Sequence, residues 1–137
     1  MNDVTYQGHA YWTGTKPSSP TENYATWTPH LWLDGWYEIR AYVPLLFNGR
    51  DDTHNARYEI LTDFDTWQTV SFDQAAYNLS HGRTVSDRWV SLGTYWLEGN
   101  HQSVGQVRLG DYTGESGRGI GVDAVQWVYR GRDASPR

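Results

Sequence analysis

The sequence predicts an all-β fold, namely a two-sheet antiparallel β-sandwich of the jelly-roll kind. Apolar and polar residues alternate with a period of two in several runs, whereas no run repeats with the period of a helix. Turn residues such as Asp34-Gly35 and Gly99-Asn100 separate the runs at short intervals. Roughly seven or eight short strands with this spacing are typical of a sandwich. The 137 residues are expected to form one domain, 1–137, with its core at about 20–130.

Each expected strand is rich in Val, Ile, Tyr, Trp and Thr, the residue types that fit a pleated, half-buried surface. In chain order the strands cover residues 24–30, 36–43, 55–61, 67–72, 89–97, 104–109 and 120–129. The second strand is predicted to turn two sets of side chains to opposite sides of its sheet. The core side takes Tyr37, Ile39, Ala41 and Val43, and the other side takes Trp36, Glu38, Arg40 and Tyr42.

Three polar segments are expected to lack regular structure. Residues 74–86 have room for a helical turn, but their polarity favours a loop, and a loop is predicted. Residues 13–21 and 130–137 combine Pro and Ser with charged residues, and both segments are predicted to be linkers. Gly93 lies inside an expected strand, which indicates a bulge or a close approach of another group to the backbone.

Composition narrows the classes of function. The net charge is −5 and the arginines are scattered, whereas a nucleic-acid binder concentrates positive charge in one patch. No apolar run approaches the roughly 20 residues that a membrane helix needs. Because the chain has no cysteine, disulfides and thiolate metal sites are excluded. We therefore expect no nucleic-acid partner and no insertion into a membrane.

Motifs for catalysis and metal binding are incomplete. Gly119 and Gly121 match a nucleotide-binding loop, but a strand pattern follows them in place of the required helix. The five histidines lack metal-binding spacing, and we expect them to be solvated. Acidic turns that include Asp52 and Asp111 leave calcium binding open beside a plain turn role. Glycoside hydrolysis needs two carboxylates that are neighbours in the folded chain but not necessarily in sequence. We expect the candidates to be surface or structural carboxylates. These are Glu38, Glu59, Asp73 and Asp123.

Six strings extend in order through residues 20–130. They are WTP at 27–29, GWYEIRAYVP at 35–44, ARYEI at 56–60, VSFDQ at 70–74, WVSLGT at 89–94 and VDAV at 122–125. Together they resemble the golvesin/xanthan-lyase carbohydrate-binding-like domain family. The resemblance implies a galactose-binding-like β-sandwich without catalytic activity. It also implies an extracellular or cell-surface location, as an accessory module attached to other domains of a larger bacterial protein.

The resemblance also implies roles for individual residues. Those expected to pack the sandwich are Trp27, Tyr37, Tyr58, Trp89 and Val125. Asp123 is expected to be partly buried, and a buried carboxylate needs hydrogen-bond partners, so it is predicted to hold a loop in place. A last-strand aspartate can instead ligate a structural calcium in related binding modules, and Asp123 is therefore the metal candidate. No other cofactor is expected.

The remaining aromatic residues indicate a ligand surface. The chain has 8 Trp and 10 Tyr but only 3 Phe, and rings with a polar group suit surfaces that are half wet. The predicted ligand-binding residues are Trp32, Trp36, Trp67, Tyr112 and Arg40, with the loop residue Trp32 first among them. The sequence thus predicts a non-catalytic module that binds polysaccharide or a glycan surface. The alternative is a structural or protein-interaction module of a surface protein or filament, without glycan binding.

Overall fold

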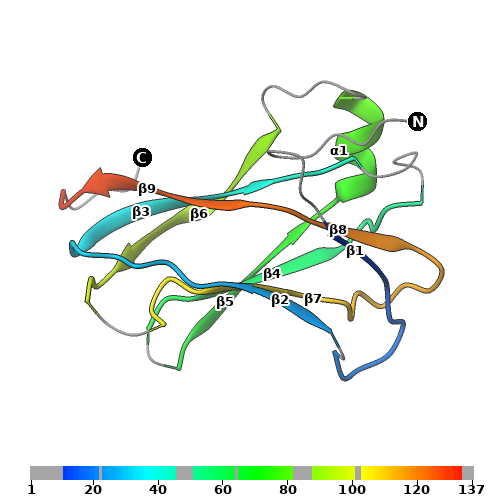
Figure 1. The fold of residues 1–137 in the computed structure, drawn as a ribbon, viewed down its shortest axis with the longest axis horizontal. Coiled ribbons are helices and arrows are strands. Elements are labelled where there is room, and N and C mark those ends of the chain that lie inside the picture. The colour runs from blue at the N-terminus through cyan, green and yellow to red at the C-terminus, as the bar shows by residue number, and fades with distance from the viewer. Residues whose placement is uncertain are drawn as a thin grey trace.

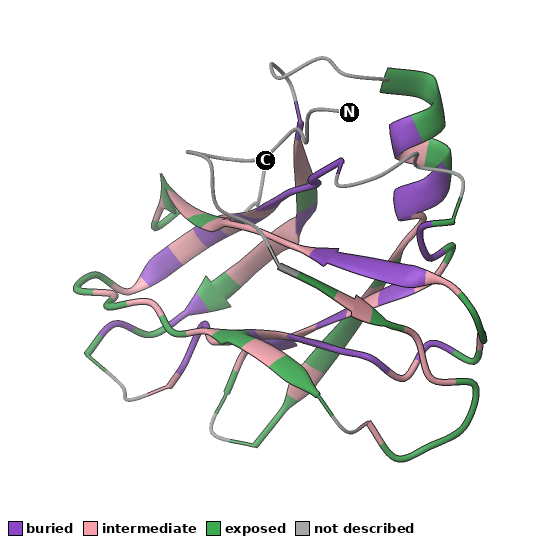
Figure 2. Ribbon diagram, turned by 45° about the vertical axis from the view of Figure 1, so that its right-hand side comes forward, coloured by how far each residue is buried: buried purple, intermediate pink, exposed green. Residues whose placement is uncertain are grey.

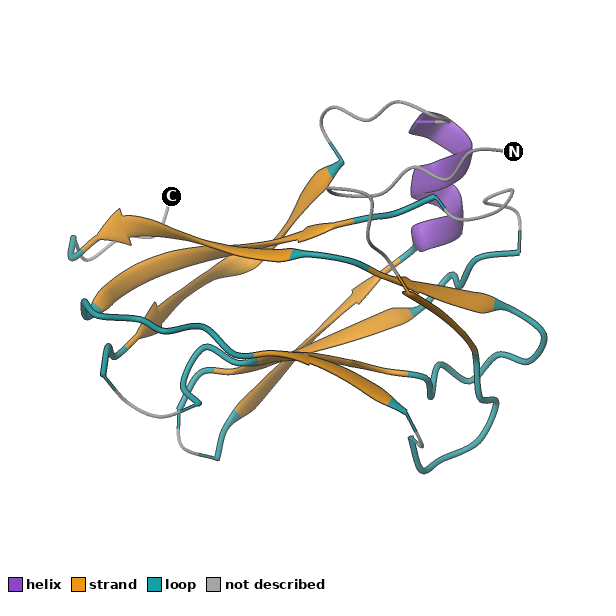
Figure 3. Cartoon of the chain, viewed as in Figure 1, coloured by secondary structure: helices purple, strands orange, loops and turns teal. Residues whose placement is uncertain are grey.

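The computed structural model describes residues 11–21, 23–45, 51–63, 65–81, 88–100 and 103–133. Within these residues the chain forms strands and one short helix, which lies at one end of the molecule (Figure 3). The elements are β1 (Tyr11–Gly14), β2 (Tyr24–Trp27), β3 (Gly35–Tyr42), β4 (Ala56–Leu61), β5 (Trp67–Phe72), α1 (Gln74–His81), β6 (Trp89–Leu97), β7 (Val107–Gly110), β8 (Gly119–Val122) and β9 (Val125–Gly131).

Two antiparallel sheets lie against each other as two layers (Figure 1). One sheet has the strand order β2-β7-β4-β5, and the other has the order β6-β3-β9. A third pairing joins β1 to β8, and β8 leads directly into β9, so this pair extends the three-stranded layer (Figure 1). The predicted all-β architecture with antiparallel sheets is confirmed.

The core lies between the two sheets and is built from alternate residues of their strands (Figure 2). In β3 the burial pattern alternates as predicted, with Ile39 fully buried and Tyr37 nearly so. In β4 the buried residues Tyr58 and Ile60 face the same cluster. Because side chains of a strand point alternately to its two faces, the residues between them are turned to the outside of each sheet.

The residues expected to pack the sandwich divide into three groups. Tyr37 and Tyr58 belong to the buried cluster, and Trp27 and Val125 are partly buried against it. Trp89 packs elsewhere, edge-on against Tyr42 with ring centroids 5.4 Å apart. Tyr42 was expected on the outer side of its sheet but is only 4% exposed, because Trp89 packs against it at the end of β3.

Gly93 forms the predicted bulge in β6. Glu38 pairs with Thr94 and Arg40 pairs with Ser91, so β6 has one residue more than β3 between these two pairs. The φ angle of Gly93 is +115°, in the region that side chains disfavour. A Cβ atom on this residue would lie 2.7 Å from the hydroxyl oxygen of Tyr95. Only glycine therefore fits the position without a shift of its neighbours.

The expected loop at 74–86 is wrong over its first part, where α1 forms. The carboxylate of Asp73 accepts a hydrogen bond from the backbone N–H of Ala76 at 2.8 Å, which caps the helix. The buried face of the helix is polar, and Gln74 both donates to and accepts from the backbone of Gly121, each at 2.9 Å. A search for apolar periodicity misses a helix that buries amides. Residues 82–86 lie outside the described residues.

The expected linker at 13–21 is also wrong. Its first residues belong to β1, in which Thr13 pairs with Ile120. The backbone N–H of Thr15 then donates to the carbonyl of Arg118 at 3.0 Å, and that of Lys16 donates to the carbonyl of Asp111 at 2.7 Å. These backbone groups have partners far along the chain, which a composition rich in Pro and Ser does not reveal.

The C-terminal strand also differs from its prediction. The expected strand at 120–129 is divided into β8 and β9, and the carbonyl of Ala124 between them accepts the backbone N–H of Tyr42 at 2.9 Å. β9 continues to Gly131, so the expected linker does not begin at Arg130. Residues 134–137 of that predicted linker lie outside the described residues.

Candidate ligand-binding face

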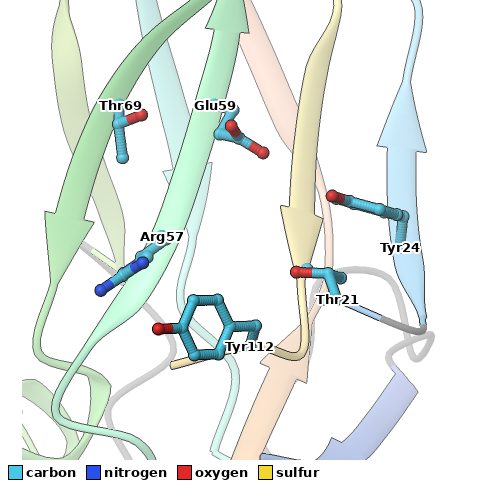
Figure 4. A pocket seen from close by; sticks show the side chains of 7 residues that line it. Thr21, Tyr24, Arg57, Glu59, Thr69 and Tyr112 are labelled. Atoms are coloured by element: carbon cyan, nitrogen blue, oxygen red, sulfur yellow. The ribbon is translucent and has the colours of Figure 1, made fainter. Parts of the chain in front are cut away.

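A pocket lies on the outer face of the four-stranded sheet (Figure 4). Its volume is about 230 Å³, and its lining residues are Thr21, Tyr24, Arg57, Glu59, Thr69, Gly110 and Tyr112. The volume is below the roughly 300–1,000 Å³ that is typical of pockets for drug-sized ligands. The pocket is therefore suited to about one ring of a larger ligand.

The register of the sheet places these side chains on one face. Directly paired residues of antiparallel strands point to the same side. Glu59 pairs with Thr69 on β5 and with Arg108 on β7, while Tyr24 of β2 pairs with Gly110. A Cβ atom on Gly110 would lie 2.5 Å from Cγ2 of Thr21 and 3.0 Å from the ring of Tyr24. Glycine here lets both residues lie directly over the sheet.

Hydrogen bonds to the buried residue Asp111 hold the two tyrosine-bearing segments together. One carboxylate oxygen of Asp111 accepts the backbone N–H of Asn23 at 3.2 Å and its side-chain amide at 2.9 Å. The backbone N–H of Asp111 donates back to the carbonyl of Asn23 at 3.1 Å. Because Tyr24 and Tyr112 directly follow these two residues, the contacts of Asp111 fix the spacing of the two rings. Asp111 is 2% exposed and is therefore not a plain turn residue.

Arginines lie over the aromatic rings of this face. The guanidinium of Arg108 lies 3.9 Å from the ring centroid of Trp67 and 5.0 Å from that of Tyr24. It also donates to both carboxylate oxygens of Glu59, at 2.9 and 3.5 Å. The guanidinium of Arg57 lies 5.0 Å from the ring centroid of Tyr112. Cation–π contacts of this kind orient charged groups and rings on a half-exposed surface.

Several polar groups of the pocket are available to a ligand. Among the residues that the structure describes, the hydroxyls of Thr21, Tyr24, Thr69 and Tyr112 make no hydrogen bond to protein. The guanidinium of Arg57 likewise makes no hydrogen bond or ion pair in these ranges, and it lies over the ring of Tyr112. The pocket thus combines two rings, four hydroxyls and one cation that solvent or a ligand can reach.

The five predicted ligand-binding residues lie in three places. Tyr112 lines the pocket, and Trp67 lies beside it on the same sheet. Trp36 and Arg40 lie on the outer face of the opposite sheet, where β3 pairs with β6 and β9. Trp32 lies in the loop before β3, is 66% exposed, and stacks on His30 with ring centroids 4.3 Å apart. Of the five, Tyr112 and Trp67 therefore lie at the pocket, whereas Trp36 and Arg40 share the face of the other sheet and Trp32 lies apart from both pairs.

The outer face of the three-stranded sheet combines aromatic and charged side chains. Trp36 contacts Trp96 edge-on with ring centroids 5.7 Å apart. The indole nitrogen of Trp36 is buried and has no hydrogen-bond partner in the described part of the chain. The carboxylate of Glu38 accepts hydrogen bonds from Arg130 and, at 2.9 Å, from Arg40. These two arginines, Arg130 first, lower the pKa of Glu38 to about 2.

A second polar cluster is buried between α1 and the ends of the sheets. Arg88 is fully buried and donates to the carbonyl of Val43 at 2.7 Å and to the side-chain oxygen of Asn78. The side-chain amide of Asn78 donates to the carbonyl of Pro44 at 3.0 Å and to the carboxylate of Asp52 at 2.7 Å. Burial raises the pKa of Asp52 above its ordinary value, although the hydrogen bond from Asn78 opposes the rise. Asp52, like Asp111, is therefore structural rather than a plain turn residue.

The remaining candidates for chemistry lie apart from the pocket. Nδ1 of His54 lies 2.9 Å from both carboxylate oxygens of Asp73, so the expectation that every histidine is only solvated is wrong for this residue. Asp123 is half-buried between β8 and β9. Across the described ranges, no group of three or more His, Asp or Glu side chains is placed to hold a metal ion. A calcium ion at Asp123 stays a prediction.

The sequence indicated only part of this pocket. In the strand predicted at 55–61, the period-two pattern places Arg57 and Glu59 on the side opposite Ala56, Tyr58 and Ile60. Such a pattern does not reveal which outward residues of different strands become neighbours. Thr21 was placed in a linker and Tyr24 in a strand, with no ligand role for either. The signal that could have found them is Asp111, since a buried carboxylate requires donors from another segment.

Comparisons of the chain with protein-family models, with curated proteins and with solved structures give no match. In the part of the chain that the structure describes, no helix has the length and apolar character needed to cross a lipid bilayer.

Proposed function

We propose that this chain is a non-catalytic carbohydrate-binding module that holds a polysaccharide in the pocket of the four-stranded sheet. One observation carries the proposal. Two tyrosine rings, held at fixed spacing by Asp111, line the same pocket as four hydroxyls without protein partners among the described residues. The proposal includes the finer assignment to a galactose-binding-like jelly roll of the golvesin/xanthan-lyase family, which the six ordered sequence strings support.

The chemistry of a sugar matches this pocket. A pyranose ring presents C–H groups on its faces and hydroxyls on its rim. Tyrosine rings receive the apolar face at a low cost in conformational entropy, because they have only two side-chain torsions. The free hydroxyls of Thr21 and Thr69 then offer donors and acceptors for the rim. The ring of Trp67 beyond Arg108 gives a longer chain a second apolar contact on the same face.

The non-catalytic part of the proposal is supported by the separation of two carboxylates. Glu38 lies on the outer face of one sheet and Glu59 on the outer face of the other, and each is bonded to arginine. A glycoside hydrolase instead places its two carboxyl groups about 5–10 Å apart around one bond. An extracellular or cell-surface location, and attachment to other domains of a parent protein, are further parts of the proposal. They are supported by the resemblance to accessory modules.

The test is binding of Tyr24→Ala and Tyr112→Ala to a panel of neutral and acidic polysaccharides, measured by affinity electrophoresis. Each variant should bind the retained polymer at least about tenfold more weakly, because about 1.4 kcal/mol of ring contact is lost. Tyr129→Ala is a matched control, since Tyr129 is 42% exposed and Tyr24 is 49% exposed, but Tyr129 lies on β9 of the opposite sheet. Circular dichroism establishes that each variant is folded.

Two results would contradict the proposal. Unchanged binding by both pocket variants, combined with loss in Trp32→Ala, would move the site to the loop before β3. Retention on none of the polymers would remove the carbohydrate function.

A protein-interaction role is the second candidate, and one surface favours it. Trp32 and Leu33 are 66% and 56% exposed in a loop beside the end of β6, where Trp96 is 36% exposed. The backbone N–H of Asn100 fixes this arrangement by donating to the carbonyl of Leu31 at 2.8 Å. Self-association in sedimentation runs that Trp32→Ser abolishes, without binding to any polysaccharide, would favour this role.

A further inference from the structure

We infer that the pocket selects sugar residues that carry a carboxylate, and that Arg57 is the residue that binds this group. The inference rests on the proposed carbohydrate-binding function and specifies its ligand as an acidic polysaccharide. It starts from the charges at the pocket. Arg57 and Glu59 line it (Figure 4), and Arg108 lies beside it, over the ring of Tyr24.

Glu59 is the lining residue that would repel an acidic ligand, and Arg108 offsets its charge. Both carboxylate oxygens of Glu59 accept hydrogen bonds from Arg108, at 2.9 and 3.5 Å. The pair buries much of its surface, since the side chains are 30% and 26% exposed. Once this pair is counted as neutral, the formal charge that remains among the lining residues is that of Arg57.

Arg57 has the chemistry of a carboxylate receptor. Within the described residues its guanidinium contacts the ring of Tyr112 and makes no hydrogen bond to an oxygen acceptor. A guanidinium has five N–H donors in a rigid plane that matches the two oxygens of a carboxylate. The contact with Tyr112 limits the freedom of the side chain before binding, which lowers the entropy lost on binding. The sugar can stack on the ring of Tyr112, so the contact between Arg57 and Tyr112 would position both the sugar ring and the carboxylate of a uronate.

The net charge of −5 argues that carboxylate binding by Arg57 is distinct from general electrostatic attraction to polyanions. Non-specific binding to a polyanion requires a broad positive surface and strengthens as salt is lowered. Here the attraction is confined to one pocket, while the other charges are screened beyond about 8–10 Å at physiological ionic strength. Selectivity should therefore depend on Arg57 itself and not on the total charge of the protein.

The experiment compares one polymer in two chemical forms. Polygalacturonate is used as it is and after reduction of its carboxyl groups to primary alcohols, which preserves the rings and linkages. The wild-type protein should bind the native polymer at least about tenfold more tightly than the reduced one, by calorimetry or affinity electrophoresis. Arg57→Met should reduce this ratio to about one, because binding of the native polymer weakens far more than binding of the reduced polymer. Arg130→Gln removes a cation from the opposite sheet and should leave the ratio unchanged.

The outcomes separate the inference from the function on which it rests. Equal binding of both polymers by the wild type, lost in Tyr112→Ala, would retain the carbohydrate function and overturn the inference. A ratio that survives in folded Arg57→Met also overturns the inference, and Arg57→Gln serves in its place if the methionine variant does not fold. Binding to neither form, nor to neutral polysaccharides, would overturn both. A ratio that Arg130→Gln abolishes as fully as Arg57→Met would show general charge attraction and also overturn the inference.

Discussion

The buried arginine of the cluster beside α1 offers a sharp test of how this fold is stabilised. Arg88→Met keeps a long side chain in place but removes the charge and its hydrogen bonds to Val43 and Asn78. The change leaves the carboxylate of Asp52, 5% exposed, without the favourable charge of Arg88. The carbonyl of Val43 and the side-chain oxygen of Asn78 also lose this donor, and a buried acceptor that loses its donor costs free energy.

The expected loss of unfolding free energy is about 3–5 kcal/mol at pH 7, because two buried acceptors lose their donor at about 1–3 kcal/mol each and the carboxylate of Asp52 also loses a nearby cation. That is a large part of the roughly 5–15 kcal/mol that stabilises a domain of this size. With a urea dependence of about 2 kcal/mol per molar, the midpoint should fall by about 2 M. Arg57→Met is the matched control, because Arg57 is at the surface and its removal should cost about 0.5 kcal/mol or less.

The pH dependence follows from Asp52. Burial raises its pKa in the folded state, so its ionisation destabilises the fold as pH rises through that value and is relieved as pH falls. Without Arg88 this pKa should rise further, and the difference between variant and wild type should shrink between about pH 7 and about pH 4. Adding Asp52→Asn should recover part of the loss at pH 7. A loss below about 1 kcal/mol that does not change with pH would refute the reasoning.

Three further predictions concern other parts of the structure. The pKa of Glu38 is lowered from 4.5 to about 2, so its stabilisation is present above pH 4.5 and is lost as pH falls toward 2. In urea titrations the wild type should therefore lose about 1–2 kcal/mol more unfolding free energy than Glu38→Gln as the pH falls through this range. The full pKa shift corresponds to about 3 kcal/mol, but solvent screens the pair because the arginine partners are about one-third exposed. Gly93→Ala should cost about 2–3 kcal/mol in the same assay, against about 1 kcal/mol for Gly117→Ala, where a Cβ meets nothing within 4 Å. Asp111→Ala should lower stability by about 1–3 kcal/mol and weaken polysaccharide binding, whereas Asp111→Asn should retain part of both.

Each of these predictions has a result that would contradict it. Parallel acid titration of stability in Glu38→Gln and wild type would mean that the two arginines do not hold the carboxylate ionised. Equal costs at Gly93 and Gly117 would mean that the bulge of β6 relaxes around a methyl group. Full polysaccharide binding by a destabilised Asp111→Ala would mean that the hydrogen bonds of Asp111 do not set the spacing of the two pocket tyrosines.

The strands were the part of the fold that the sequence could predict. β5 and β6 have the expected bounds, and β3 and β4 differ from them by one residue at their ends. These strands bury alternate residues of apolar type, and such a pattern is visible in one segment alone. α1 was missed because the residues that it buries, among them Gln74 and Asn78, are amides whose partners lie on Gly121 and Pro44. β1 was missed because its strand partner lies at the other end of the chain.

The candidate site was harder to predict, for a reason of the same kind. Aromatic content indicated that rings were available, and Tyr112 was among the residues named from it. Whether a ring lies in a pocket depends on pairings between strands that are distant in sequence, such as that of Tyr24 with Gly110. Trp36 and Trp67 look alike in sequence, each at the start of an alternating run, yet they lie on opposite sides of the molecule. A pattern within one segment cannot tell which of the two tryptophans lies beside the pocket.

The alternation along β4 also matters for engineering. Ala56, Tyr58 and Ile60 hold the two sheets together, while the intervening Arg57 and Glu59 line the pocket. A library that varies the pocket positions of this strand, together with Thr69 on its neighbour, therefore leaves the interior side chains untouched. The strand works as a scaffold on one side and as a variable recognition surface on the other. New ligand preferences can be selected on it without redesign of the protein's interior.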